Sequence, residues 1–198
     1  MIFKQETQIL KCTFEKEHFS KVKAAFKDRW PVVYIIEDDE KGQAYIGEST
    51  NICTRICDHW NNTERRALKN IYIIFNKVFN KSVILDLEAF LIGYIVADGK
   101  YRLQNGNGGQ HVHNYYLRDE YQREFRHIWQ LLQDEGVVRH GITLLENQDL
   151  FKYSPYKILN LDQFNVAVQI LTDLKYDLGN NNQSRSFIID GGAGTGKS

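Results

Sequence analysis

Two short apolar stretches on either side of a turn limit the fold of this chain more than any other feature. The stretch VVYIIE at 32–37 is rich in β-branched and aromatic residues, and QAYIG at 43–47 follows it after the turn-forming DDEKG. Stretches of this kind around a short polar turn are typical of an antiparallel β-hairpin. The sequence therefore predicts a hairpin over 32–47 with one tyrosine on each strand, Tyr34 and Tyr45.

Helices and one further strand are predicted around this hairpin. Apolar spacing and capping residues indicate two helices, a long apolar run that stops at Asp98-Gly99 indicates a third, and IYIIF indicates a strand. In chain order these are an amphipathic helix at 14–27, a helix at 52–60, a strand at 71–75 and an apolar helix at 82–97. The expected fold class is α/β (α+β), with a three-stranded antiparallel sheet flanked by helices.

The placement of these elements divides the chain into four parts. We expect an N-terminal amphipathic helix at 1–30, a first domain at 31–112, a helical connector at 113–160 and the start of a P-loop domain at 161–198. The Gly- and Asn-rich loop LQNGNGGQHVHN ends the first domain, because it is too polar to be a core element. The whole predicted sheet therefore belongs to the first domain.

The net charge excludes a general electrostatic attraction for nucleic acid. The chain has 25 basic and 25 acidic residues and a pI near 7. A nucleic-acid surface must therefore be local, and the stretch 53–81 is rich in Lys and Arg. The alternative is a solvated helix face whose charges are balanced by acids elsewhere. The candidate nucleic-acid contacts are Arg65, Arg66, Lys69, Lys77 and Lys81.

The apolar content indicates a globular protein without a membrane partner. Hydrophobic residues make up 42% of the chain, yet no apolar run reaches the ~18 residues of a membrane span, and MIFKQETQ lacks the features of a signal peptide. We expect a cytoplasmic protein whose three cysteines are free thiols. Zinc is the alternative at Cys53, Cys57 and His59, but this spacing supplies only three ligands.

A set of polar side chains suits the hydrolysis of a phosphodiester. Arg55 and His59 are four residues apart, so both project from one helix face over the hairpin. Glu88 is a rare charge in an apolar helix, where a carboxylate needs a partner such as a metal ion. Hydrolysis needs an activated water and stabilisation of charge on the phosphate and the leaving oxygen. The candidate set is Tyr34, Tyr45, Arg55, His59, Glu88 and Asn105.

At these residues the chain resembles the GIY-YIG nuclease family. Val32-Val33-Tyr34 stands where the family has Gly-Ile-Tyr, and Tyr45-Ile46-Gly47 matches the second triplet in full. Arg55 follows Tyr45 by ten positions, and His59 stands where the family carries His or Tyr. The missing first Gly and Ile leave the tyrosine that carries the hydroxyl. Asn105 and Asn107 could each be the family's asparagine, and we take Asn105.

The resemblance implies a metal-dependent endonuclease that leaves a 5′-phosphate. Glu88 would bind a single Mg²⁺ or Mn²⁺, and Arg55 would neutralise charge on the scissile phosphate. Tyr34, with Tyr45 and His59, would position or deprotonate the attacking water. Because tyrosine has an ordinary pKa of ~10, the metal or the arginine would have to lower it. The expected partner is nucleic acid, DNA in preference to RNA.

A second motif, GGAGTGKS, occupies 191–198 and satisfies the P-loop pattern after FIID, which predicts a strand. Upstream, LDQFNVAVQIL resembles the adenine-reading Q motif of superfamily 1 helicases. The whole is similar to bacterial proteins that fuse a GIY-YIG nuclease to a Schlafen-group helicase-like ATPase, often suspected in defence against foreign DNA. The expected ATP-binding residues are Gln163, Gly191, Gly194, Gly196, Lys197 and Ser198.

The P-loop predicts that the chain is part of a longer parent protein. ATP and its Mg²⁺ would bind only in that parent protein, and its ATPase domain is an expected partner of the nuclease. Two alternatives to the nuclease stay open. One is a catalytically silent nucleic-acid-binding module that regulates the ATPase, and the other is a protein-interaction domain. His111 and His113 form an HxH pair that could hold a metal, but a loop pair alone is a weak pattern, and we expect either phosphate contact or no function there.

Overall fold

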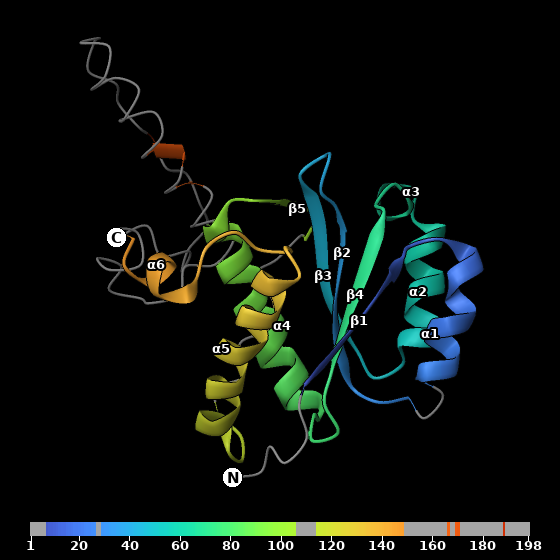
Figure 1. Ribbon diagram of the computed structural model, residues 1–198, viewed down its shortest axis with the longest axis horizontal. Coiled ribbons are helices and arrows are strands. Elements are labelled where there is room, and N and C mark those ends of the chain that lie inside the picture. The colour runs from blue at the N-terminus through green and yellow to red at the C-terminus, as the bar shows by residue number, and fades with distance from the viewer. Residues whose placement is uncertain are drawn as a thin grey trace.

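A computed structural model describes residues 7–26, 29–105 and 114–148, together with the single positions 166, 169, 170 and 188. The described elements form a central sheet with helices on both sides (Figure 1). They are β1 (Gln8–Thr13), η1 (Lys16–His18), α1 (Phe19–Ala25), β2 (Val32–Asp38), β3 (Gln43–Ser49), α2 (Ile52–Asn61), α3 (Thr63–Arg66), β4 (Asn70–Phe75), α4 (Lys81–Asp98), β5 (Arg102–Leu103), α5 (Arg118–Asp134) and α6 (Ile142–Glu146).

The predicted hairpin is confirmed and lies in a sheet with the strand order β1-β4-β2-β3-β5. β2 and β3 pair in antiparallel register with Tyr34 opposite Gly47 and Ile36 opposite Tyr45. The predicted third strand is β4, on the other side of β2. The mixed α/β class with flanking helices is therefore confirmed, and the sheet has two more strands than the three predicted.

The two additional strands lie at the edges of the sheet, where sequence patterns are weakest. β1 has the sequence QILKCT and pairs antiparallel with β4, and all of its residues are exposed or half-buried. β5 is two residues long and pairs in parallel with Gln43 and Ala44 of β3. Neither strand has enough apolar residues to be recognised without its partner, because an edge strand buries only part of its surface.

The sheet separates two apolar cores. α1 and α2 lie on one side of it, and α4, α5 and α6 lie on the other (Figure 1). Because successive strand residues point to opposite faces, Tyr34 and Tyr45 join the core beneath α1 and α2, whereas Ile35 and Ile46 join the core beneath α4 and α5. The tyrosines of both strands therefore meet on the α2 face.

The long apolar helix is confirmed as α4, which has core neighbours on several sides. Asn80 caps its start by accepting a hydrogen bond from the backbone of Val83, and Gly99 ends it with φ of 67°. The predicted connector helix is α5, which packs against α4 in the same core. Within the described residues, no helix is both long and apolar enough to cross a membrane.

Candidate active site

The hairpin brings the first tyrosine against the glycine of the second strand. A Cβ atom added to Gly47 would lie 2.4 Å from Oη of Tyr34, well inside any normal contact. Glycine is therefore required at this position so that the Tyr34 ring can cross the neighbouring strand. The Tyr34 side chain is fully buried, and only its hydroxyl group carries a polar function.

The two helix residues that were predicted to face the hairpin both reach Tyr34. Asn51 caps α2 by accepting a hydrogen bond from the backbone of Thr54, which fixes where the helix starts. From this helix His59 places Nε2 2.7 Å from the Tyr34 hydroxyl, and Arg55 donates from Nε to the same oxygen at 3.3 Å. The structure therefore gathers three of the predicted catalytic residues around one oxygen atom.

The second tyrosine completes this cluster through ring contacts. The centroid of the Tyr45 ring lies 4.8 Å from that of His59 and 6.2 Å from that of Tyr34. On its other side the guanidinium carbon of Arg65 lies 3.6 Å from the ring centroid. A guanidinium at this distance over an aromatic face is a cation–π contact. Arg65 was predicted as a nucleic-acid contact, and the structure places it inside the tyrosine and histidine cluster.

Burial sets the protonation states in this cluster. Burial and then the neighbouring Tyr45 raise the pKa of the Tyr34 phenol well above its ordinary value, although Arg55 partly opposes this. Burial together with the positive charges of Arg55 and Arg65 lowers the pKa of His59 to about 3. At neutral pH the tyrosine is therefore a neutral phenol and the histidine a neutral imidazole.

Glu88 comes from α4, on the opposite face of the sheet, and reaches the same strand edge. Burial and the nearby charge of Glu48 raise the pKa of its half-buried carboxyl to about 7, while Lys81, Arg55 and a hydrogen bond from the backbone of Glu48 partly offset this. The charges of Glu88 and Tyr34 also act on each other. The acid therefore lies within electrostatic reach of the tyrosine cluster.

Glu48 is a site residue that the sequence did not indicate. One of its carboxylate oxygens binds Lys81 at 2.5 Å, whereas Oε2 is buried and has no hydrogen-bond partner among the described residues. Because Glu48 directly follows Tyr45-Ile46-Gly47, strand alternation places it on the α4 face beside Glu88. This alternation is the sequence feature from which a position of Glu48 near Glu88 could have been predicted.

Asn105 binds the backbone of β3 and not another side chain of the predicted set. Its Oδ1 accepts from the backbone N–H of Ile46 at 3.0 Å, and its Nδ2 donates to the Ile46 carbonyl at 2.8 Å. One residue pair earlier, the backbone of Gln104 binds Ala44. Further along, the backbone of Glu48 binds Glu88. By this geometry Asn105 holds the strand that carries Tyr45.

These contacts define the β3 edge, which is the part of β3 from residue 46 to residue 49. β5 pairs only with Gln43 and Ala44, so within the described chain no strand covers the outer side of the β3 edge. Side chains from the α2 face and from the α4 face therefore converge there. The backbone of the β3 edge is already bound at Ile46 by Asn105 and at Glu48 by Glu88, so a ligand at this edge would contact mainly side chains.

The five basic residues proposed as nucleic-acid contacts do not form one patch. Lys81 pairs with Glu48, and Lys69 pairs with Glu40 and Asp38 at the hairpin turn. Arg66 and Lys77 are exposed, before and after β4 respectively. Lys69 and Lys77 flank the six residues of β4, so they lie at opposite ends of that strand. Charge balance by acids, the alternative weighed above, accounts for Lys69 and Lys81.

Other predicted sites lie away from this cluster or outside the described residues. Cys53 and Cys57 are free thiols directed at backbone carbonyls, and His59 is engaged with Tyr34. No three His, Cys, Asp or Glu side chains in the described part of the chain gather as a metal site. The positions outside the described residues are Asn107, His111, His113, Gln163, Gly191, Gly194, Gly196, Lys197 and Ser198.

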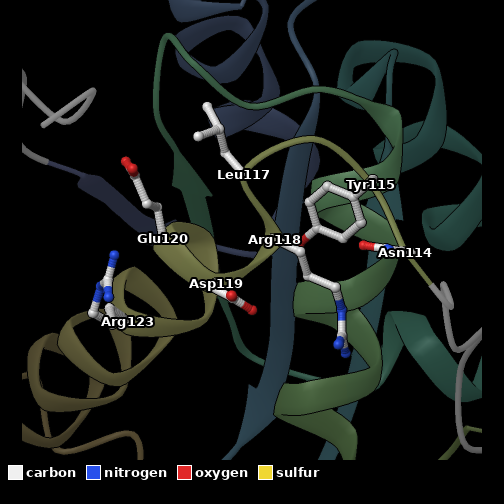
Figure 2. A pocket seen from close by; sticks show the side chains of 7 residues that line it. All are labelled: Asn114, Tyr115, Leu117, Arg118, Asp119, Glu120 and Arg123. Carbon is white, nitrogen blue, oxygen red and sulfur yellow. The ribbon is translucent and has the colours of Figure 1, made fainter.

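A hollow of about 430 Å³ lies elsewhere, at the start of α5 (Figure 2). Tyr115 and Arg118 lie over α4 there and bind Asp86 through their hydroxyl group and Nε. Asp119 and Glu120 line the hollow beside Arg118 and Arg123, so its charges are mixed. None of the predicted catalytic residues lines this hollow. A mixed surface gives no field for a polyanion, and we do not assign the chemistry to it.

Comparison with known protein families finds one that this arrangement resembles. Residues 31–102, from β2 to the start of β5, match the sequence model of the GIY-YIG catalytic domain. Residues 31–102 are therefore similar to the GIY-YIG catalytic domain, and domains of this class are endonucleases that generally depend on a divalent metal. No curated protein and no solved structure matches the chain significantly.

Proposed function

We propose that this chain hydrolyses phosphodiester bonds of nucleic acid at the β3 edge, with DNA preferred over RNA. The observation that carries the proposal is the convergence on one strand edge of a buried hydrogen-bonded tyrosine and histidine, an arginine, and a carboxylate from the opposite face. The preference for DNA is supported by the helicase-like motifs of the sequence and by nothing in the geometry.

The acidic residues at the β3 edge fit a single divalent cation. Glu88 is half-buried with a pKa of about 7, and Oε2 of Glu48 is buried without a hydrogen-bond partner among the described residues. Carboxylate oxygens are ligands that Mg²⁺ and Mn²⁺ prefer, and Mg²⁺ sites commonly use one or two of them together with substrate phosphate. Glu88, with Glu48 beside it, would hold the ion, which when bound would supply positive charge to the scissile phosphate.

Arg55 supplies the fixed positive charge of the site. Its side chain is largely exposed at the edge of the cluster, and Nε donates to Tyr34, which orients the guanidinium. The planar guanidinium carries five N–H donors and matches the geometry of phosphate oxygens. Arg55 would therefore bind the scissile phosphate and stabilise the charge that develops on it during hydrolysis.

Tyr34 and His59 would position the attacking water. Both are neutral at neutral pH, so the pair acts first by hydrogen bonding and not as a charged base. The Tyr34 oxygen is held by His59 and Arg55, and Tyr45 packs against the histidine ring. A phenol fixed in this way can orient a water molecule. To take a proton from that water it would first have to become the phenolate, with its own proton released to solvent, and a bound cation would favour this by lowering the phenol's pKa.

We also propose that this nuclease is the N-terminal module of a longer nuclease and ATPase protein. The support is the P-loop motif at 191–198 and the Q-like motif around Gln163, which are sequence features only. In that parent protein ATP and Mg²⁺ would bind at Lys197 and Ser198. A role in defence against foreign DNA rests on the resemblance to Schlafen-group fusions.

Cleavage of a substrate panel tests the proposal. Supercoiled plasmid, single-stranded DNA and RNA are incubated with the chain in Mg²⁺, Mn²⁺ or EDTA, beside Glu88→Gln and the control Glu17→Gln, which changes an exposed acid near α1. We expect metal-dependent nicking of DNA by the parent chain and the control, and none by Glu88→Gln. Binding without cleavage by all three proteins would instead support a silent nucleic-acid-binding module.

A further inference from the structure

The side chain of Arg65 is held in the cluster by several contacts, although Arg65 is not one of the positions that match the GIY-YIG motifs. Asn62 caps α3 by accepting hydrogen bonds from the backbone of Glu64 and Arg65, which fixes the turn that carries the arginine. The guanidinium stacks on Tyr45 and donates from Nη2 to the carbonyl of Gln104 at 3.4 Å. Two contacts thus hold the Arg65 side chain in place, in addition to its contact with His59.

The contact between Arg65 and His59 has only one possible direction. Nη1 of Arg65 lies 3.4 Å from Nδ1 of His59, with its hydrogen directed at that nitrogen. A guanidinium has donors and no acceptor, so Nδ1 must be the bare nitrogen of the ring. Because the neutral imidazole carries one proton, that proton is on Nε2.

We propose that Arg65 is a positioning residue that fixes His59 as the Nε2–H tautomer, so that His59 donates a hydrogen bond to Tyr34 and does not accept one from it. The contact concerned is the 2.7 Å contact between Nε2 and the Tyr34 hydroxyl oxygen. Its importance for hydrolysis rests on the function proposed above, whereas the tautomer itself does not.

This tautomer decides what the Tyr34 hydroxyl can do. Its oxygen accepts from Nε2–H of His59 and from Nε–H of Arg55, so both lone pairs are used inside the protein. The hydroxyl proton is then the part of this buried group that neither His59 nor Arg55 engages. With the opposite tautomer, His59 would take that proton for its own hydrogen bond, and Tyr34 could not offer it to water or phosphate.

Two donors into one phenol oxygen also favour its ionised form, although burial has the larger effect and keeps the pKa of Tyr34 raised. The same arrangement would therefore help Tyr34 to give up its proton when a cation is present. Arg65 affects this loss of the proton indirectly, because it contacts His59 and His59 contacts the hydroxyl group. Its loss should change kcat more than KM, by roughly 10- to 100-fold, as small misplacements of reacting groups do.

Nitrogen NMR of the histidine rings tests the tautomer without substrate or metal. Protonated and bare imidazole nitrogens have well-separated ¹⁵N chemical shifts, and the His59 signals are identified as those missing from a His59→Gln sample. The measurement is made at neutral pH on the parent chain, on Arg65→Met, and on Arg66→Met as a control that removes the exposed charge next in sequence.

We expect a bare Nδ1 and a protonated Nε2 in the parent chain and in Arg66→Met, and a shift toward the Nδ1–H form in Arg65→Met. A parent chain with protonated Nδ1 would overturn the proposal even if Arg65→Met did not fold. An unchanged tautomer in a folded Arg65→Met would overturn it as well. Cleavage is measured separately, so an inactive protein with the expected tautomer would contradict the proposed nuclease and leave the role of Arg65 at His59 in place.

Discussion

The two faces of the sheet use buried polar groups in different ways. On the α4 face Asp86 binds Tyr115, Arg118 and Gln122, and Asp98 binds two backbone N–H groups and the ring of His140. These carboxylates are well supplied with protein partners, and they tie α5 and the segment before α6 to α4.

The α2 face differs because its polar groups lie toward a strand edge. Tyr34, Arg55 and His59 bind one another, and from across the edge Glu48 adds an oxygen without a partner among the described residues. Unsatisfied buried polar atoms are costly, so they are retained where a ligand can satisfy them. Asp86 and Asp98 on the α4 face therefore serve stability, whereas the candidate site draws side chains from both faces where these meet at the β3 edge.

The largest loss of cleavage rate is expected from substitution of Arg55 in the candidate site. Arg55→Gln removes the charge that binds the phosphate, and we expect the cleavage rate to fall roughly 10²- to 10³-fold, as for other preorganised transition-state donors. Arg66→Gln removes an exposed charge from the adjacent turn and should leave the rate nearly unchanged. Equal losses in the two variants, measured as kcat on plasmid DNA, would mean that only the overall charge matters.

A stability effect of smaller size is expected where the two strands cross. Gly47→Ala places a Cβ 2.4 Å from the hydroxyl of Tyr34, and we expect it to lower the free energy of unfolding by about 1–3 kcal/mol, as overpacking does. Gly93→Ala is the control within α4, where an added Cβ meets nothing within 4 Å. It should stabilise the helix by about 1 kcal/mol. Urea unfolding of both variants checks the pair, and a tolerated Gly47→Ala would contradict the packing described for Tyr34.

The pH dependence of metal binding provides a third test. The pKa of Glu88 is raised from 4.5 to about 7, so its folded carboxyl keeps a proton that the unfolded chain has lost. In the absence of metal, this stability is fully present below pH 4.5 and is lost as the pH rises through about 7. A cation competes with that proton, so the increase in Tm caused by Mg²⁺ should grow between these two pH values.

The variant Glu88→Gln separates this effect from the other titrating group of the site. The pKa of His59 is lowered from 6.5 to about 3, so its contribution is present above pH 6.5 and is lost as the pH falls toward 3. This term is nearly common to the samples with and without Mg²⁺ and largely cancels in their difference. An Mg²⁺-dependent increase in Tm that persists unchanged in Glu88→Gln would place the ion elsewhere.

The smallest effects are expected among the surface lysines. Lys77→Gln removes an exposed charge and should weaken DNA binding less than about tenfold. The slope of log affinity against log salt concentration should fall by about one, because one fewer counterion is released on binding. Lys69→Gln should change the affinity less, because Lys69 is paired with Asp38 and Glu40. Affinity measured over a series of salt concentrations compares them, and a larger effect at Lys69 would extend the nucleic-acid surface to the hairpin turn.

The parts of the fold with strong periodicity could be predicted from the sequence. The hairpin, β4 and α4 follow from β-branched stretches and a long apolar run, and the position of Arg55 and His59 on one helix face follows from their spacing. The edge strands could not be predicted, because β1 and β5 exist only through pairing with a neighbour.

The candidate site could be predicted only in part from the sequence. Strand alternation places Glu48 on the α4 face, but its position beside Glu88, and the contacts of Arg65 with Tyr45 and His59, join residues far apart in the sequence, which no local pattern contains. Asn105 belongs to the predicted set, but its contact with the backbone of Ile46 depends on the position of β5 beside β3. Long-range placement therefore decides which polar residues share a site.

The most direct test of a nuclease site built from both faces of the sheet is diffraction at the manganese absorption edge. Crystals would contain the protein, Mn²⁺ and a short DNA duplex with uncleavable phosphorothioate linkages. The predicted result is one manganese signal at the Glu88 carboxylate, with a backbone phosphate bound by Arg55 at the β3 edge. A manganese ion or DNA backbone bound only elsewhere, such as at the hollow beside α5, would contradict the account.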